Sequence, residues 1–183
     1  PPPNAFIKAY QEAFDAGAEQ IICICVSSKI SATYQAAISA LEMFPGKDIT
    51  VIDALNLCMA QGFMALAAAE AAERGASKEE ILGIIMDLQK RLHVYAALPT
   101  LKYLAMGGRM GKLAAGIADT LNIKPVLTSR DGKLELLEKV RTLRKAEDRL
   151  VELAVAAAAG KKVERVALIH VINTSGVLAL FGK

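Results

Sequence analysis

Residues 22–35 constrain the fold most, because an apolar strand runs there directly into a hydroxyl-rich turn and then into a helix. Residues 20–26 are dense in apolar and β-branched side chains without polar alternation, the pattern of a strand buried on both faces of a parallel sheet. A helix over about 31–44 and a second short strand over 48–53 follow. Strand, crossover helix and strand form a βαβ unit, so the first part of the chain is predicted to be doubly wound α/β.

The turn carries four hydroxyl side chains, Ser27, Ser28, Ser31 and Thr33. Strand carboxyl ends in α/β sheets open onto crevices, and a following helix directs unpaired N–H groups and the positive end of its dipole into them. One interpretation is therefore a site for an anionic head group. The other is that these residues only cap the helix, because Ser and Thr are common N-caps. The local chemistry leaves both interpretations open.

The other helices of the first half have clear start and stop signals. Asn4 is expected to cap a first helix that ends at Gly17, and a long helix over about 57–74 ends at Gly75. The sequence from Ser77 to Glu80 is a capping box that opens another helix. One apolar face of that helix is formed by Ile81, Ile84, Ile85, Leu88 and Leu92.

A glycine-rich stretch around Arg109 is the second candidate site. A strand over 94–98 and a short helix from Thr100 to Met106 lead into Gly107-Gly108-Arg109-Met110-Gly111-Lys112, and a helix over about 112–121 should follow. An arginine held at such a turn offers a bidentate guanidinium to a carboxylate or phosphate. The alternative is a helix C-cap with Arg109 paired to a nearby acid. No phosphate-binding loop of the Walker or Gly-x-Gly-x-x-Gly type occurs.

The second half changes character. Strands over 123–128 and 134–138 are joined by Arg130-Asp131-Gly132-Lys133, and Asp-Gly is a strong hairpin signal. A helix over 144–159 and a strand over 163–171 follow. We therefore predict an α/β protein with a Rossmann-like, three-layer first domain over residues 1–91 and a two-layer α/β second domain with a mixed sheet over residues 92–183.

Composition excludes several classes of function. The least polar window, residues 54–69, is interrupted by polar side chains and is shorter than the roughly 18 residues of a spanning helix, so no membrane insertion is expected. The net charge of +3 is scattered and Trp is absent, which argues against nucleic acid as a partner. Cys23 and Cys25 share one strand face, and three cysteines in all indicate reduced thiols in a cytoplasmic protein. Single histidines, His93 and His170, predict no metal site.

Several motifs in a fixed order resemble the DegV family of bacterial fatty-acid-binding proteins over nearly the whole chain. Residues 27–35, Ser-Ser-Lys-Ile-Ser-Ala-Thr-Tyr-Gln, are similar to that family's Ser-Ser-x-Leu-Ser-Gly-Thr-Tyr-Gln, with Ala32 in place of Gly. The other landmarks are Val51-Ile52-Asp53-Ala54, Gly107-Gly108-Arg109-Met110-Gly111, Asn122-Ile123-Lys124-Pro125 and Leu137-Glu138-Lys139-Val140-Arg141.

The resemblance implies a long-chain fatty acid lying between two domains, with its carboxylate held by Ser31 and Arg109. Ser27, Ser28 and Thr33 are secondary candidates with turn and capping roles. The family's Thr-Ser-x-Pro threonine and its C-terminal histidine have no counterpart here, so we expect the sequence to be an incomplete record of the protein. The family function is to present the carboxylate to a separate fatty acid kinase that makes the acyl-phosphate for phospholipid metabolism. The chain would then be a bacterial binding subunit without catalytic residues, cofactor or metal.

Two other functions compete with this one. The same serine turn and Arg109 could bind the phosphate group in an enzyme that acts on a phosphorylated small molecule. The chain could also be a structural module without a small ligand.

Overall fold

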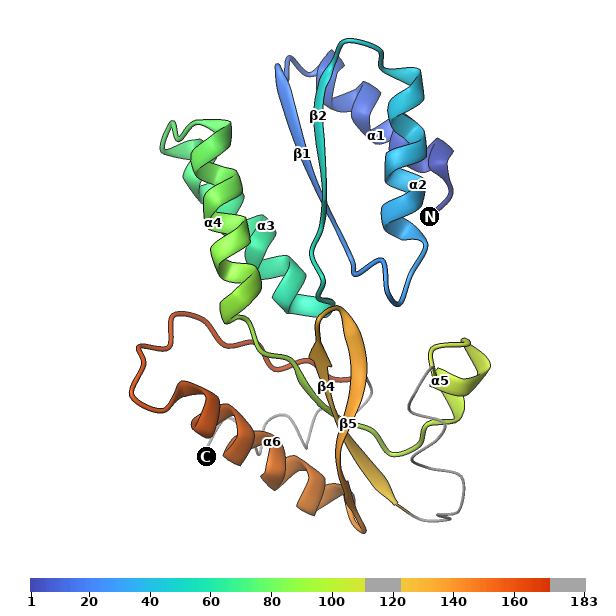
Figure 1. Ribbon diagram of the computed structural model, residues 1–183, viewed down its shortest axis with the longest axis vertical. Coiled ribbons are helices and arrows are strands. Elements are labelled where there is room, and N and C mark those ends of the chain that lie inside the picture. The colour runs from blue at the N-terminus through green and yellow to red at the C-terminus, as the bar shows by residue number, and fades with distance from the viewer. Residues whose placement is uncertain (111–122, 172–183) are drawn as a thin grey trace. The chain divides into compact units, whose positions relative to one another are not determined.

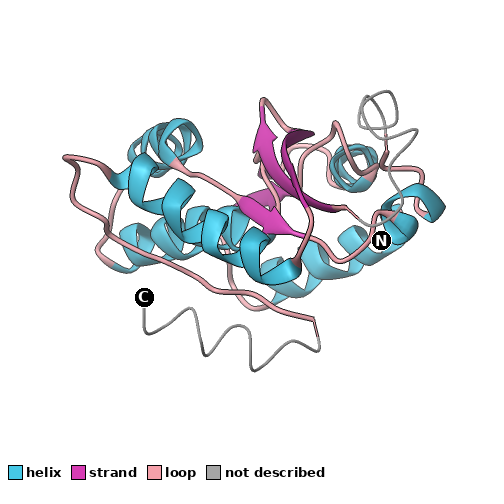
Figure 2. Cartoon of the chain, turned by 90° about the horizontal axis from the view of Figure 1, so that it is seen from below, coloured by secondary structure: helices cyan, strands magenta, loops and turns pink. Residues whose placement is uncertain are grey.

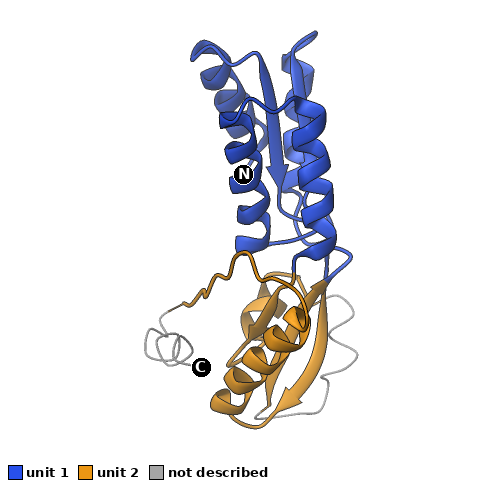
Figure 3. Cartoon of the chain, turned by 90° about the vertical axis from the view of Figure 1, so that its left-hand side faces the viewer, with its two compact units in different colours: residues 1–92, 130–133 blue, residues 93–129, 134–183 orange. Residues whose placement is uncertain are grey.

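The computed structural model describes residues 1–110 and 123–171. The chain forms two compact units, shown in different colours in Figure 3. Unit 1 contains Pro1–Leu92 and the short segment Arg130–Lys133, and unit 2 contains His93–Ser129 and Leu134–Lys183. The predicted helix over 112–121 and the final residues 173–182 lie outside the described residues.

Unit 1 has a parallel pair of strands at its centre (Figure 1). Strand β1 pairs with β2 in register from Gln20 opposite Asp48 to Cys25 opposite Asp53. This confirms the predicted βαβ unit. The elements of unit 1 are α1 (Pro3–Asp15), β1 (Gln20–Cys25), α2 (Thr33–Ser39), the 3-10 helix η1 (Ala40–Met43), β2 (Asp48–Asp53), α3 (Cys58–Glu73) and α4 (Lys78–Arg91).

Helices cover both faces of this strand pair, which gives unit 1 three layers. Ile22 and Ile24 pack with Met64 of α3 and Ile85 of α4 in one hydrophobic cluster. The alternate residue Cys23 packs with α1 and η1 in a second cluster around Tyr10, Ala40 and Phe44. Because side chains alternate along a strand, the two clusters lie on opposite faces.

Two helix starts differ from the prediction. Asn4 does not cap α1, because Pro2 is the N-cap and Pro3 is already helical. Proline suits the first helical position, since its fixed φ matches the helix and its missing N–H would have had no partner there. The predicted helix over 31–44 is a shorter α2 that tightens into η1.

The α4 start and its packing are as predicted. The Ser77 side chain accepts from the Glu80 amide, and the Glu80 carboxylate accepts from the Ser77 amide at 2.7 Å. Ile81 and Ile85 are buried on the predicted face.

Unit 2 is built on a three-stranded sheet in the order β3-β4-β5. Its elements are β3 (Tyr95–Ala97), α5 (Lys102–Met106), β4 (Lys124–Arg130), β5 (Lys133–Val140) and α6 (Leu143–Ala158). The sheet is antiparallel, so the predicted mixed sheet is not seen in the described residues. The Asp131-Gly132 turn between β4 and β5 is confirmed, with φ of 49° and 77°. Figure 2 shows the helices and strands by type.

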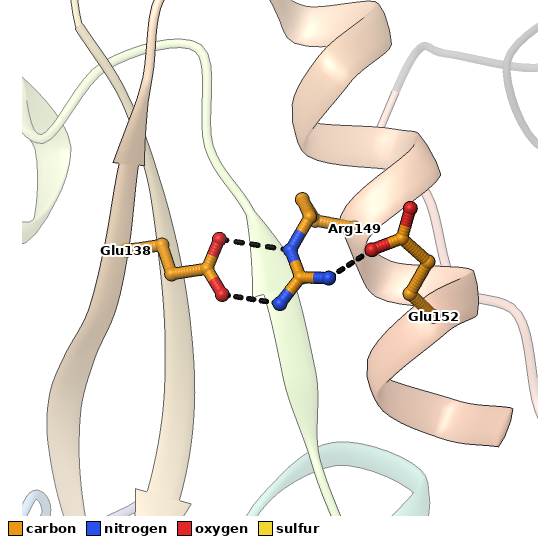
Figure 4. Close-up of polar contacts among 3 residues, drawn as sticks. All are labelled: Glu138, Arg149 and Glu152. Atoms are coloured by element: carbon orange, nitrogen blue, oxygen red, sulfur yellow. Dashed lines mark hydrogen bonds and ion pairs between the residues drawn. The ribbon is translucent and has the colours of Figure 1, made fainter. Parts of the chain in front are cut away.

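Helix α6 is held on the sheet by apolar and ionic contacts. Ala146 packs against Val126 and Val140. The Arg149 guanidinium donates to both carboxylate oxygens of Glu138 on β5, with Nε–Oε2 at 2.8 Å, and it also pairs with Glu152 (Figure 4). The apolar contacts and the Arg149–Glu138 pair hold α6 over β5, whereas the pair with Glu152 lies within α6.

The predicted strand over 163–171 is wrong, because this segment has no regular secondary structure. Its apolar side chains, such as Val166 and Ile169, are exposed. A strand needs a neighbouring strand to pair with its backbone N–H and C=O groups, and no strand of the described sheets pairs with this segment.

No helix among the described residues is long and apolar enough to cross a membrane.

Candidate functional site

The turn after β1 is fixed by Ser27, which is fully buried. The Ser27 hydroxyl donates to the carbonyl oxygen of Gly132 at 2.7 Å and accepts from the Lys29 amide at 3.2 Å. The Ser27 amide donates to the carbonyl of Asn56 at 2.9 Å. Ser27 therefore makes hydrogen bonds to backbone groups of three segments, at Lys29, Asn56 and Gly132. This is the turn role predicted for it.

Asp53, the last residue of β2, ties this turn to the end of the neighbouring strand. Its Oδ1 accepts from the Ser28 amide at 3.1 Å and from the Leu55 amide at 3.0 Å. The carboxylate thus connects the loop after β1 with the loop after β2. Ser28 itself is exposed.

Ser31 lies at the start of α2 and is half-buried. Its Oγ accepts from the Thr33 amide at 3.2 Å and lies 2.8 Å from Thr33 Oγ1. Ser31 therefore performs a capping function, although the formal N-cap residue of α2 is Ala32 and makes no side-chain cap. When Thr33 Oγ1 is the donor, Ser31 Oγ accepts twice and its own proton is free to bind an anion.

Gly132 comes so close to this turn that only glycine fits. A Cβ at Gly132 would lie 2.5 Å from Ser27 Oγ and 3.0 Å from Leu55 Cδ2. The positive φ at Gly132 adds a second reason for glycine. The turn of the β4-β5 hairpin is thereby part of unit 1, although its strands belong to unit 2.

The loop after β2 is strained where it meets Ser27. Leu55 and Cys58 have positive φ angles of 46° and 52°, which residues other than glycine rarely adopt. Between them, Asn56 is buried and accepts the Ser27 amide through its carbonyl. Such strain persists only where surrounding contacts hold it, here the Asp53 and Ser27 hydrogen bonds.

Arg109 follows the end of α5 in unit 2. Gly108 has a φ of 70° and donates to the Ala105 carbonyl at 3.0 Å, while the Arg109 amide donates to the Leu104 carbonyl at 2.9 Å. The C-cap interpretation of these glycines is thus confirmed. The Arg109 side chain is exposed, and its Nη1 donates to the Gly107 carbonyl at 2.6 Å.

Ser31 and Arg109 belong to different units. Their meeting at one ligand stays a prediction.

Asp53, Asn56 and Gly132 were not predicted to take part in the site, although Gly132 was predicted in the hairpin turn. Asp53 stood inside the Val51–Ala54 landmark, and a carboxylate at a strand end next to a serine turn was the signal that could have identified it. The contact of Gly132 with Ser27 spans 105 positions, so no local pattern reveals it.

The histidines show no metal-binding arrangement in the part of the chain that the structure describes. His93 is exposed and stacks on Tyr95, with ring centroids 6.3 Å apart, and His170 is exposed. No group of three or more His, Cys, Asp or Glu side chains among the described residues could hold a metal ion.

Comparisons with known proteins give one consistent result. A family model described as an uncharacterised protein of the DegV family matches residues 1–181. A DegV domain-containing protein of Streptomyces coelicolor is 37% identical over 164 residues, which cover 90% of this chain and 58% of that protein.

Two solved structures are similar in fold and sequence. One is a DegV family protein from Thermus thermophilus described as binding a fatty acid, with a TM-score of 0.79 and 35% sequence identity. The match covers 87% of this chain and 56% of the Thermus chain. Bacillus subtilis DegV, described as a fatty acid binding protein, has a TM-score of 0.77 and 33% identity over the same shares of both chains. The chain therefore spans less than two thirds of these relatives.

Proposed function

Because this chain belongs to the DegV family, we propose that it binds a long-chain fatty acid and holds the carboxylate with Ser31 and Arg109. The observation that carries the proposal is the hydroxyl turn after β1, where Ser31 Oγ accepts from Thr33 and can direct its own proton outward. Fatty acid binding by the similar Thermus and Bacillus proteins supports the choice of ligand.

Ser31 supplies a neutral hydrogen bond to the head group. The Thr33 amide donates to Ser31 Oγ and Thr33 Oγ1 lies within hydrogen-bond distance of it, so Ser31 is held in place and little rotational entropy is lost when its hydroxyl donates to a carboxylate oxygen. The Asp53 and Ser27 hydrogen bonds hold the backbone of this turn before any ligand arrives.

Arg109 supplies the positive charge. A guanidinium can donate two parallel hydrogen bonds to one carboxylate, which fixes the head group in orientation. The acyl tail supplies most of the affinity, because burying each methylene contributes about 0.8 kcal/mol.

We further propose that the chain is a binding subunit, which presents the oriented carboxylate to a separate kinase for acyl-phosphate formation. A carboxylate held by a hydroxyl and a guanidinium keeps its charge and stays nucleophilic toward a phosphoryl donor. The chemistry then belongs to the kinase, and this chain supplies position and orientation.

Mass spectrometry of the organic extract of purified full-length protein tests the ligand. A co-purifying long-chain fatty acid is the expected result. Absence of lipid together with binding of a sugar phosphate would overturn the proposal in favour of an enzyme of phosphorylated small molecules.

Variants of the serine turn test the site. Ser31→Ala and Arg109→Ala should each weaken fatty acid binding by about 10-fold or more, because each removes a hydrogen bond to a charged group. Ser39→Ala is the matched control, since Ser39 lies at the end of α2, outside the candidate set, and its side chain makes no cap hydrogen bond. Equal affinity of Ser31→Ala, Arg109→Ala and Ser39→Ala would refute the site but not the ligand.

A further inference from the structure

Asn56 carries a buried side-chain amide without a hydrogen-bond partner. The residue is 6% exposed, and its side chain makes no hydrogen bond with the residues that the structure describes. Two other buried polar residues differ from it, because the hydroxyls of Ser27 and Thr128 both donate to backbone carbonyls. Roughly nine in ten buried polar groups of proteins have a partner, so the amide of Asn56 needs an explanation.

Capping of the next helix does not explain Asn56. Asparagine is a preferred N-cap, because its side-chain oxygen can accept from the first helical amides. The N-cap of α3 is Leu57, however, one residue after Asn56, and no side chain caps this helix. The backbone carbonyl of Asn56 is occupied by the Ser27 amide at 2.9 Å, but the side-chain amide is left over.

Asn56 lies in the same loop region as Ser31, within unit 1. Ser27 joins the two residues, since its amide donates to the Asn56 carbonyl and its carbonyl accepts from the Ser31 amide at 3.1 Å. Asn56 and Ser31 follow the carboxyl ends of the parallel strands β2 and β1, the edge at which α/β sheets bind their ligands. Neither polar atom of the Asn56 side chain is fully closed off from solvent, so a ligand can reach the amide.

The chemistry of the amide indicates the kind of ligand atom. The side-chain nitrogen of asparagine carries two N–H donors, and a carboxylate offers only acceptors. A hydrogen bond to a charged carboxylate is about twice as strong as one between neutral groups. We propose that Asn56 is a further ligand of the fatty acid head group and donates its side-chain N–H to a carboxylate oxygen. This inference rests on the proposed function, because the ligand is the same fatty acid.

Such a role predicts opposite effects of one substitution on folding and on binding. In the ligand-free protein the amide has given up hydrogen bonds to water and gained none within the protein, which disfavours the folded state. Leucine has nearly the shape of asparagine and no polar group. Asn56→Leu should therefore keep or raise the melting temperature of the ligand-free protein and weaken fatty acid binding. An asparagine with a structural role would instead lose stability when replaced.

Competition between a saturated long-chain fatty acid and a fluorescent fatty acid tests the proposal on full-length protein freed of lipid. Asn56→Leu should bind the saturated acid about 10-fold or more weakly than the parent, because a hydrogen bond to a charged group is lost. Asn56→Asp should bind it more weakly still, since an ionised carboxyl cannot donate and repels the carboxylate of the ligand. An Asn56→Asp variant with the affinity of the parent would exclude the donor role.

Gln61→Leu is the matched control, because it replaces an amide of unit 1 that has a partner. Gln61 Nε2 donates to the Ile24 carbonyl at 2.8 Å. Gln61→Leu should lower the melting temperature and leave the affinity for the fatty acid unchanged, which is the reverse of the result expected for Asn56→Leu.

Two outcomes would overturn the role of Asn56 and leave the proposed function intact. One is equal affinity of Asn56→Leu and a parent protein that does bind the fatty acid. The other is a ligand-free Asn56→Leu variant that melts at a lower temperature than the parent, as Gln61→Leu should. A parent protein that binds no fatty acid would overturn the proposed function itself, and the role of Asn56 with it.

Discussion

At the residue scale, the closest contact in the candidate site is the one between Gly132 and Ser27. Alanine at position 132 would require Ser27 to give up its hydrogen bond to the Gly132 carbonyl and would strain a backbone with positive φ. We expect Gly132→Ala to lose about 1–2 kcal/mol from the positive φ and about 1–3 kcal/mol more from the buried hydroxyl. Urea denaturation measures both contributions together.

The control for this prediction is Gly46→Ala in the same unit. Gly46 has a φ of 75°, but a Cβ there would meet nothing within 4 Å. Gly46→Ala should therefore show the backbone cost alone. If the two variants lose the same stability, the contact with Ser27 is not a constraint on the turn.

Asp53 gives a second prediction at this scale, because one carboxylate oxygen holds two loop amides. Asp53→Ala should lose about 1–2 kcal/mol of stability and weaken fatty acid binding, since Ser28 and Leu55 lose their acceptor. Asp53→Asn keeps an acceptor oxygen at the same place and should restore most of both. Ligand binding that is equally strong in Asp53→Ala and the parent would show that the turn does not need this anchor.

The sequence identified the hydroxyl residues of the turn but not which of them is buried as a structural anchor and which is exposed. Ser27, Ser28 and Ser31 are chemically alike, and they differ in burial and partners that come from elsewhere in the chain. The buried position of Ser27 depends on Gly132, which is distant in sequence.

At the element scale, two local signals were reliable because the partner of each backbone group is close in sequence, whereas the Asn4 cap was wrong because α1 already begins at Pro3. The capping box of α4 and the Asp131-Gly132 hairpin are set by neighbouring residues, and both are present. The prediction of a strand over 163–171 was wrong because apolar and β-branched residues give only a preference for strand structure. A strand forms only where a neighbouring strand offers hydrogen bonds.

The pair of Glu138 and Arg149 gives a prediction that depends on pH. The hydrogen bonds from Arg149 lower the pKa of the Glu138 carboxyl below its ordinary value of 4.5. A lowered folded-state pKa means that the pair stabilises the fold above the unfolded pKa and that this stabilisation is lost as pH falls through the folded pKa. Glu138→Gln should therefore lower the melting temperature at pH 7 and make little difference at a pH below the folded-state value.

Glu152→Gln is the matched control for that pair. Glu152 contacts the same guanidinium from within α6, three positions along, and does not connect the helix to the sheet. It should change the melting temperature less than Glu138→Gln at pH 7. Equal effects of the two substitutions would mean that the contact across to β5 adds nothing to the stability of unit 2.

At the scale of the whole molecule, sequence reasoning recovered the α/β class and the parallel strand pair covered on both faces. It did not foresee that Arg130–Lys133 belongs with the first unit while the strands on either side belong to the second. Membership of a unit depends on contacts such as Ser27 with Gly132, and hydrophobic periodicity carries no information about them.

The last prediction concerns the ligand as a whole. In a series of saturated fatty acids, each added methylene that the protein buries should tighten binding about fourfold, since about 0.8 kcal/mol corresponds to that ratio. Ser31→Ala and Arg109→Ala should weaken every member of the series by one common factor and leave the dependence on chain length unchanged, because they touch only the carboxylate. Competition with a fluorescent fatty acid gives both quantities in one experiment. Affinity that is independent of chain length would show that the protein recognises an anion and not a lipid.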